Sequence, residues 1–331
     1  MSAVDELRPL GLACGKVILL GEHAVVYGVP AIAVGIDRGA HARAVGLASG
    51  PSELRVRGWD VHVREHEEGP ALARAFTELL RATRDSLAER GAVLHPSRVE
   101  AAADLPPGGG LGCSAATGVA VARALDPLAS SSEIASRVMA WERVFHGNPS
   151  GVDAAVSARG GCVYFERGEP LVPLRLRGGA DLVLAVGSTG VGSSTKFMVE
   201  AVAARLAAEP LATRARFEQI RRLVRSARSA IEAGDLVALG AALSQNQVVL
   251  AELALSTPEI ERMCAVAAAA GALGAKLTGA GGGGSVVALV DSPERGAAVV
   301  AAWGEAGFGG FVSRVRGQPE SASARSIEVA P

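Results

Sequence analysis

Hydrophobic residues in the first part of the chain follow both strand and helix spacing. Strict alternation of apolar and polar residues at 54–57 and 61–64 predicts two short strands that pair with each other. Between residues 71 and 90 the apolar side chains recur every three or four positions, which predicts a helix. Further strands are expected at 16–20, 97–106, 161–165 and 181–186, and further helices at 114–129 and around Trp141.

The second part of the chain is richer in helical patterns. Four helices are expected, at 195–208, 213–233, 235–252 and 258–270, and SVVALV predicts a strand after a run of glycines. Helix pairs that alternate with antiparallel strands favour an α+β fold. We place the domain boundary in the loop near 178–180, so that the expected domains are 1–178 and 179–331.

Composition and charge exclude several classes of protein. With 331 residues, of which 49% are hydrophobic and 20% charged, the chain can bury a large core and is not intrinsically disordered. The net charge of −1 provides no basic excess for holding nucleic acid through its phosphates. No apolar run reaches the ~18 residues of a membrane span, and the acidic N-terminus does not resemble a signal peptide.

The cysteines indicate a reducing compartment. Four of them lie far apart, at Cys14, Cys113, Cys162 and Cys264, and none forms a CxxC pair, which excludes a zinc knuckle or a dithiol redox motif. So few thiols in a chain of this length are typical of a cytosolic protein. We therefore expect a cytoplasmic protein that has neither nucleic acid nor a membrane as a partner.

The sequence does not support three familiar ligand-binding motifs. GLACGKV is one residue shorter than a P-loop and lacks its hydroxyl. The run at 279–284 satisfies GxGxxG, but a predicted helix precedes it and a strand follows, which is the reverse of a dinucleotide fingerprint. His62 and His66 lie four residues apart in a charged stretch, where a solvated surface is favoured over a metal site.

The glycine cluster at 106–116, PPGGGLGCSAA, is a better candidate for a phosphate site. Successive glycines allow backbone N–H groups to turn toward one point, and the helix that follows adds the positive end of its dipole. Ser114 could offer its hydroxyl to Mg²⁺. Alternatively, Ser114 caps the helix after an ordinary glycine turn.

A second glycine cluster, KLTGAGGGG at 276–284, is interpreted as another loop. Five glycines in six positions cost chain entropy, so a backbone that passes close to a bound ligand is favoured over a purely structural turn. The pattern alone is only moderately specific, because structural turns also contain such glycines.

Polar residues that phosphoryl transfer could use lie in three places. Lys16 begins the first strand, Glu22 and His23 lie in the turn that follows, and Glu142 and Asp153 flank the irregular turn HGNPSG. Phosphoryl transfer needs a metal, charge stabilisation and an oriented nucleophile. Each residue also has an ordinary alternative: a surface lysine, a turn cap, a half-buried histidine, a solvated helix face or a helix cap.

Three segments, in this order, resemble the signature motifs of the GHMP small-molecule kinases: GKVILLGEHAVVYG, PPGGGLGCSAA and KLTGAGGGG. HGNPSGVD and the GEHAVVYG opening are similar to the mevalonate kinases within that superfamily, as are GSTGVGSSTKFMVEAV and STPEIERM. The resemblance extends over residues 16–284. It implies an N-terminal domain like ribosomal protein S five, a ferredoxin-like C-terminal domain and a site between the two.

The resemblance also implies an ATP- and Mg²⁺-dependent kinase that phosphorylates the C5 hydroxyl of (R)-mevalonate in isoprenoid biosynthesis. Asp153 would be the general base or would orient the hydroxyl, and Lys16 would pair with Asp153 and stabilise charge on the attacking oxygen and the γ-phosphate. Ser114 and Glu142 would hold Mg²⁺. ATP would be bound by Pro107, Gly108, Gly109, Gly110, Leu111, Gly112, Cys113, Ser114 and Ala115, and mevalonate by Lys16, Glu22, His23, Asp153, Thr278, Gly279, Ala280 and Gly281. Glu22 and His23 would either contact mevalonate directly or position its neighbours.

Three residues depart from the family pattern. Cys14 replaces a proline before the catalytic lysine, Cys113 replaces the first serine of Gly-Ser-Ser, and Gln247 replaces the histidine of an Asn-His pair. A thiol beside a helix N-terminus could have a lowered pKa and be sensitive to oxidation. A small buried filler is the favoured interpretation of Cys113.

Other functions remain open at this point. The nearest alternative is another GHMP kinase that acts on a different alcohol or on C3 of mevalonate, and a non-catalytic sensor on the same fold is an alternative of a different class. A dehydrogenase is the weakest. Retention of Lys16, Ser114, Glu142 and Asp153 together argues against the sensor, and a homodimer is an open possibility because many relatives are dimers.

Overall fold

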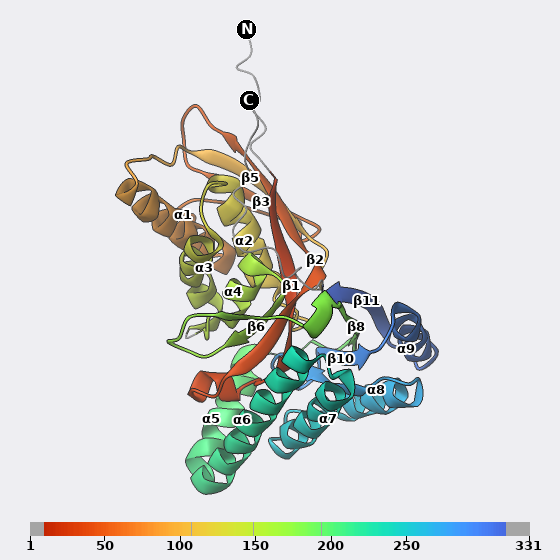
Figure 1. The fold of residues 1–331 in the computed structure, drawn as a ribbon. Coiled ribbons are helices and arrows are strands. Elements are labelled where there is room, and N and C mark those ends of the chain that lie inside the picture. The colour runs from red at the N-terminus through yellow and green to blue at the C-terminus, as the bar shows by residue number, and fades with distance from the viewer. Residues whose placement is uncertain (1–9, 107, 148, 193, 316–331) are drawn as a thin grey trace.

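The structure, a computed structural model, describes residues 10–106, 108–147, 149–192 and 194–315. Their backbone forms two β-sheets (Figure 1), one from strands up to Leu174 and the other from strands beginning at Leu182. Helices pack against both sheets. This arrangement confirms the expected α+β class.

The first sheet has seven strands in the order β4-β3-β5-β2-β6-β7, with β1 pairing along β2. Its neighbouring strands are antiparallel except for β3 and β5, which run parallel. In the second half of β2, buried residues alternate with exposed ones, because helices cover only one face of the sheet there. The strands are β1 (Gly11–Leu20), β2 (Ala31–Gly46), β3 (Glu53–Arg57), β4 (Val61–Arg64), β5 (Ser97–Ala103), β6 (Cys162–Phe165) and β7 (Val172–Leu174).

Four helices lie on one side of this sheet (Figure 1). One of them, α2, packs directly on β1, β2 and β5, and nearly all its residues are buried because its small alanine side chains and Gly118 permit close contact. The turn between β1 and β2 contains a short 3₁₀ helix, η1 (Ala24–Tyr27). The helices are α1 (Ala71–Glu89), α2 (Cys113–Leu125), α3 (Ser131–His146) and α4 (Val152–Arg159).

The second sheet has four antiparallel strands in the order β11-β8-β10-β9. Helices α7, α8 and α9 pack against it, and α6 packs along α7. Its strands are β8 (Leu182–Ser188), β9 (Gly274–Thr278), β10 (Ser285–Val290) and β11 (Gly309–Val315), and the helices are α5 (Thr195–Ala208), α6 (Pro210–Ala233), α7 (Leu236–Glu252), α8 (Pro258–Ala269) and α9 (Pro293–Glu305). A further 3₁₀ turn, η2 (Arg177–Gly179), lies between β7 and β8.

The structure confirms most predicted elements and corrects two. The alternating segments form the antiparallel pair β3 and β4, and the periodic segment at 71–90 forms α1. Residues 276–278, expected in a glycine loop preceded by a helix, instead belong to β9, so the glycines connect two antiparallel strands. The alanine-rich helix ends at Leu125 rather than 129, because Pro127 disfavours helical backbone at the residue before it. Strands β7 and β11 and helix α9 were not predicted.

The two sheets meet where the glycine loops approach each other. The Ser285 hydroxyl donates to the Gly109 carbonyl at 2.6 Å, which joins the second loop to the first. A Cβ on Gly110 would lie 3.1 Å from the Thr278 carbonyl oxygen, and a Cβ on Gly279 would lie 3.0 Å from the Cα of Gly110. Both positions have positive φ, so glycine is favoured there by conformation as well as by space.

A search of the described ranges for long apolar helices finds none that could span a membrane. The helices instead carry buried faces that pack on a sheet or on each other, as the seven buried positions of α1 illustrate. In the described residues, the buried apolar surface therefore lies between the two sheets and the helices that pack on them.

Candidate active site

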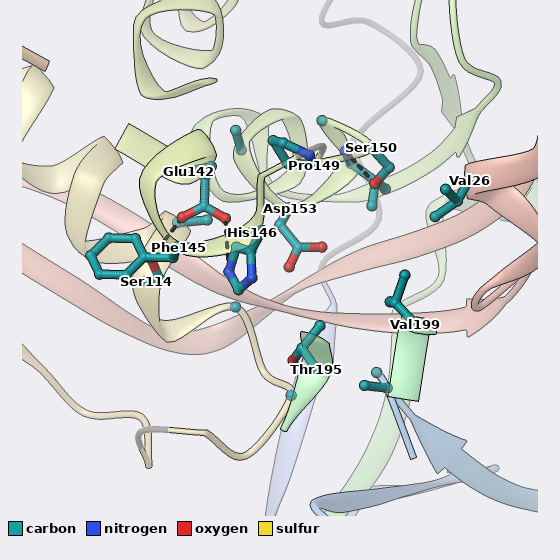
Figure 2. Close-up of a pocket in the computed structure, with 18 of the residues that line it drawn as sticks. Val26, Ser114, Glu142, Phe145, His146, Pro149, Ser150, Asp153, Thr195 and Val199 are labelled. Carbon is teal, nitrogen blue, oxygen red and sulfur yellow. Dashed lines mark hydrogen bonds and ion pairs between the residues drawn. The ribbon is translucent and has the colours of Figure 1, made fainter. Parts of the chain in front are cut away.

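An open cavity of about 640 Å³ lies beside the glycine loops, and residues from both halves line it. Strand β1, the η1 turn and helices α2, α3 and α4 contribute from the first half, and α5 and the loop after β9 contribute from the second. Figure 2 shows Glu142, His146 and Asp153 grouped on one side, with Thr195 and Val199 of α5 across from Asp153. The site is therefore assembled from segments far apart in the sequence.

Lys16 and Asp153 form an ion pair in this cavity, with 3.2 Å between Nζ and Oδ1. The Lys16 side chain is only 4% exposed, whereas the Asp153 side chain is 33% exposed. The lysine also donates to the Gly110 carbonyl at 3.1 Å. Gly151 is the N-cap of α4 and Asp153 lies within the first turn, so the interpretation of Asp153 as a helix cap is wrong.

Ser114 and Glu142 form a second polar pair beside the first. The Ser114 hydroxyl at the start of α2 donates to Glu142 Oε1 at 2.7 Å and accepts from Trp141 Nε1 at 3.1 Å. Burial raises the pKa of Glu142 to about 7 and repulsion from Asp153 adds to the rise, although the bond from Ser114 and the charge of Lys16 oppose it. The N-cap of α2 is Gly112, so Ser114 is not the cap that the ordinary interpretation required.

The donor set of this second pair fits a magnesium ion. A hydroxyl and a buried carboxylate are hard oxygen ligands, and Mg²⁺ is commonly held by one or two carboxylates together with waters and substrate phosphates. Within the described ranges no cluster of three or more His, Cys, Asp or Glu side chains could hold a metal on its own. Waters and phosphate oxygens would therefore complete the coordination of an ion at Ser114 and Glu142.

The first glycine loop borders the cavity next to these pairs. A Cβ on Gly112 would lie 2.8 Å from Cγ of Lys16, so glycine at this position leaves room for the lysine stem. Leu111 is buried and does not line the cavity, in contrast to its expected part in the ATP site. Pro107 lies outside the described residues. The predicted nucleotide residues that do line the cavity are Gly108, Gly109, Gly110, Gly112, Cys113, Ser114 and Ala115.

Glu22 and His23 border the cavity but are engaged with the protein. The Glu22 side chain is 0% exposed and pairs with Lys276, while Asn246 Nδ2 donates to Glu22 Oε2 at 3.3 Å. His23 Nε2 donates to the Ala280 carbonyl at 2.8 Å, and burial lowers the pKa of His23, which favours the neutral ring. Of the two roles expected for these residues, positioning of neighbours accords better with the geometry than direct contact with a ligand.

The second glycine loop reaches the cavity only at Gly279 and Ala280. The Thr278 hydroxyl donates to the Ile18 carbonyl at 3.1 Å and accepts from the Ile18 N–H at 3.0 Å, so it binds the two halves together and does not line the cavity. Gly281 also lies away from the cavity, where a Cβ would come within 2.3 Å of the Leu255 carbonyl. The expectation of a ligand next to this whole loop is therefore corrected, because most of its glycines accommodate protein backbone or side chains.

Several lining residues were not singled out from the sequence. His146 Nε2 lies 3.6 Å from Glu142 Oε2, and burial lowers the pKa of this histidine. Arg143, Thr195 and Lys196 also line the cavity. His146 lies within the quoted HGNPSG motif, and Thr195 and Lys196 lie within GSTGVGSSTK, so the motifs contained the signal but their spacing did not show which side chains face inward.

The structure explains the departures from the family pattern. Cys14 Sγ donates to the Val156 carbonyl at 3.2 Å, and burial raises its pKa to about 11. Burial likewise raises the pKa of Cys113 to about 11, so the suggested oxidation-sensitive thiolate is wrong and the buried-filler interpretation is favoured. Gln247 Nε2 donates to Ser256 Oγ at 2.9 Å and its Oε1 accepts from the Leu277 N–H at 2.9 Å, which makes Gln247 a structural bridge.

The chain is similar to known proteins over most of its length. Residues 72–161 match the model for the GHMP kinases N terminal domain, and residues 227–309 match that for GHMP kinases C terminal. A mevalonate kinase of Aeropyrum pernix is 37% identical over 85% of this chain and 88% of its own length. A mevalonate kinase of Pyrococcus abyssi is 33% identical over 86% of this chain and 90% of its own.

A solved structure shows the same architecture. The crystal structure of L. major mevalonate kinase in complex with R-mevalonate superposes with a TM-score of 0.76 at 27% identity. The match covers 96% of this chain and 99% of the other. Both sheets and the cavity between the glycine loops therefore lie within the region of similarity.

Proposed function

Because the chain belongs to the mevalonate kinases, within the GHMP kinases, we propose that it transfers the γ-phosphoryl group of ATP to the C5 hydroxyl of (R)-mevalonate. The observation that carries this proposal is the convergence of four side chains on one cavity. Lys16, Ser114, Glu142 and Asp153 come from one strand and three helices and meet beside a glycine loop.

Asp153 accepts the proton of the substrate hydroxyl in the proposed reaction. The hydroxyl oxygen forms a bond to the γ-phosphorus, the bond from that phosphorus to the bridging oxygen of ADP breaks, and the proton passes to the Asp153 carboxylate. The partial exposure of Asp153 leaves its free oxygen accessible from the cavity. In addition to accepting the proton, Asp153 holds the hydroxyl in line with the phosphorus, which also contributes to the rate.

Lys16 supplies fixed positive charge at the point where negative charge develops. Its ammonium is already oriented by Asp153 and by the Gly110 carbonyl, so little reorganisation is needed during the reaction. The Gly110 contact also connects Lys16 to the loop that would carry the phosphates. In this proposal the lysine stabilises both the attacking oxygen and the γ-phosphate.

The nucleotide and its metal would lie at the N-terminus of α2. Backbone N–H groups of the glycine loop and the helix N-terminus favour phosphate, and Ser114 and Glu142 would hold Mg²⁺. The ion would neutralise charge on the β- and γ-phosphates. The raised pKa of Glu142 supports this assignment, because a cation beside that carboxylate would relieve the cost of burying its charge.

The two halves of the proposed enzyme correspond to domains 1–178 and 179–331. The position of η2 (Arg177–Gly179) in the connection from β7 to β8, between the two sheets, supports a boundary there. Under this division the first domain supplies the phosphate loop and all four reacting side chains. The second domain supplies α5 and the Gly279–Ala280 wall of the cavity.

A coupled assay of ADP release tests the proposal. The purified chain is incubated with ATP and Mg²⁺ and with mevalonate, 5-phosphomevalonate, homoserine or galactose in parallel, and phosphorus NMR identifies the phosphorylated position. We expect turnover on mevalonate alone, giving the 5-phosphate, and its loss when EDTA removes the metal. Turnover on a different alcohol would replace the substrate assignment, and binding of ATP without any turnover would favour the sensor.

A further inference from the structure

The most deeply buried charges of the described chain form a pair behind the active site. The ammonium of Lys276 on β9 donates to Glu22 Oε1 in the turn after β1, and both side chains are 0% exposed. Each residue comes from a different half of the molecule. A lone charge at such a depth costs several kcal/mol, so each of these residues is tolerated because the other is present.

All three N–H donors of the Lys276 ammonium are used within the protein, so none is left for a ligand. Its three ammonium protons have three acceptors: Glu22 Oε1, the Leu277 carbonyl and, at 3.5 Å, the Ile18 carbonyl. An arginine would bring five N–H donors on a wider planar group, and two of them would stay unsatisfied here. Lys276 therefore acts on the site through other residues and not by touching a substrate.

The use of lysine in this sequence supports a special role for that ammonium. The chain has 33 basic residues, and only Lys16, Lys196 and Lys276 are lysines, which leaves 33 − 3 = 30 arginines. Two of the three lysines line the cavity, and the third is paired behind it. All three lysines of this arginine-rich sequence therefore lie in or next to this one site.

Glu22 lines the same cavity as Lys16. Burial raises the pKa of the Glu22 carboxyl, and the charges of Lys276 and then of Lys16 oppose that rise, so both cations attract the carboxylate. Lys276 also repels Lys16, because the charge of Lys16 lowers the pKa of Lys276 alongside the larger effect of burial. Lys16 thus shares the cavity with two carboxylates: it pairs with Asp153, and Glu22 is already paired with Lys276.

The backbone that carries Lys16 is held at the same place. The Ile18 carbonyl, two residues along β1 from Lys16, accepts from both Lys276 and the Thr278 hydroxyl. The pairing of β1 with β2 shifts register just beyond this point, between Ile18 and Leu20, so the strand lacks regular ladder support there. Contacts from β9 compensate for that irregularity.

We propose that Lys276 is a positioning residue for phosphoryl transfer: by neutralising Glu22 across the junction of the two halves, it keeps the Lys16 ammonium on Asp153 and the incoming phosphate. The inference rests on the proposed roles of Lys16 and Asp153. Glu22 in this view is the partner of Lys276 and does not contact the substrate. Removing the cation alone diverts Lys16 toward Glu22, whereas removing both charges restores its position.

Three variants test this inference against the wild type: Lys276→Met, Glu22→Gln and the double variant. For Lys276→Met we expect kcat per folded enzyme to fall about 10- to 100-fold, the size of effect that follows from misplacing a reacting group by up to about 1 Å, with the KM for mevalonate within about threefold. In the double variant no charge competes for Lys16, so kcat returns to within about fivefold of the wild type. Wild-type kcat in folded Lys276→Met, or no recovery in the double variant, would overturn the proposal.

A matched control separates this effect from a general loss of stability. Arg84→Met removes the cation from another buried carboxylate, Glu65, which pairs with Arg84 away from the cavity. This control should lower the unfolding midpoint in urea with an unchanged kcat. If Lys276→Met does not fold, the double variant alone decides. A folded and active double variant supports the proposal, whereas a folded double variant whose kcat is more than tenfold below the wild type refutes it.

The same assays distinguish this inference from the proposed function. If the wild type does not phosphorylate mevalonate, the function itself is wrong, and the variants are not needed to show it. If the wild type is active and the double variant does not recover, only the role of Lys276 is wrong. Binding of ATP, measured by calorimetry, should be similar in all four proteins because no nucleotide contact is changed.

Discussion

Replacing Gly112 by alanine should displace the Lys16 side chain by a predictable amount. The new Cβ would lie 2.8 Å from Cγ of Lys16 and 3.3 Å from its Cε. Carbon atoms in contact normally lie about 3.5–4.0 Å apart, so the lysine stem must retreat by about 0.7–1.2 Å. The stem is buried, with 4% exposure, and its ammonium is held by Asp153 and Gly110, so the retreat breaks that arrangement.

A displacement of about 1 Å at a reacting group can cost about 100-fold in rate, which is the fall in kcat expected for Gly112→Ala. Gly112 also has φ of 73°, where a residue with a Cβ costs about 1–2 kcal/mol of stability. Gly91→Ala is the matched control, because Gly91 has φ of 70° and nothing within 4 Å of its Cβ position. In urea, Gly112→Ala should lose at least as much stability as Gly91→Ala, and only Gly112→Ala should lose turnover in the ADP-release assay.

Two results would refute this reasoning. If folded Gly112→Ala turns over at the wild-type rate, Lys16 either tolerates the shift or is not needed where the structure places it. If Gly91→Ala loses turnover to the same degree, backbone strain and not the contact with Lys16 explains the effect. A fall confined to Gly112→Ala, with the KM for ATP little changed, supports the geometry.

Three further predictions follow from the site. Asp153→Asn should lower kcat by several orders of magnitude while calorimetry still shows ATP binding, and near-normal turnover would remove Asp153 from the mechanism. The pKa of Glu142 is about 7, and only the ionised carboxylate binds Mg²⁺. The apparent Mg²⁺ affinity, measured by titrating the rate against Mg²⁺, should therefore fall about tenfold from pH 8 to pH 6. An affinity that does not change with pH would contradict the metal role. Gln247→Ala leaves the buried Leu277 N–H without its acceptor and should cost about 1–3 kcal/mol in urea unfolding with kcat retained, whereas unchanged stability would show that Gln247 is not a bridge.

The four side chains of the proposed reaction could be identified as candidates from the sequence because each lies in or beside a short motif. Lys16, Ser114, Glu142 and Asp153 each lie in or beside a quoted segment, and the structure places all four at one cavity. Periodicity also identified α1, because its apolar face is regular over five turns. A motif or a period within one segment was sufficient to predict features that depend on that segment alone.

Features that depend on contacts between distant segments were not predictable in this way. Thr278 was expected at the substrate, but its hydroxyl is used by Ile18, which lies 260 residues away in the sequence. The glycines at 279–284 were attributed to a ligand, because sequence alone does not reveal the protein backbone that approaches them. Strand β9 was missed because five residues, GAKLT, are too few to show a period beside an alanine-rich helix.

The scarcity of lysine gives this protein a natural chemical handle. Lys16 is 4% exposed and Lys276 is 0% exposed, whereas Lys196 at the start of α5 is 80% exposed at the edge of the cavity. An amine-reactive dye applied to the native protein would therefore find, among the lysine side chains, essentially the one beside the active site. A fluorophore attached there, without any engineered cysteine, would report on occupancy of the cavity as nucleotide and alcohol enter and leave.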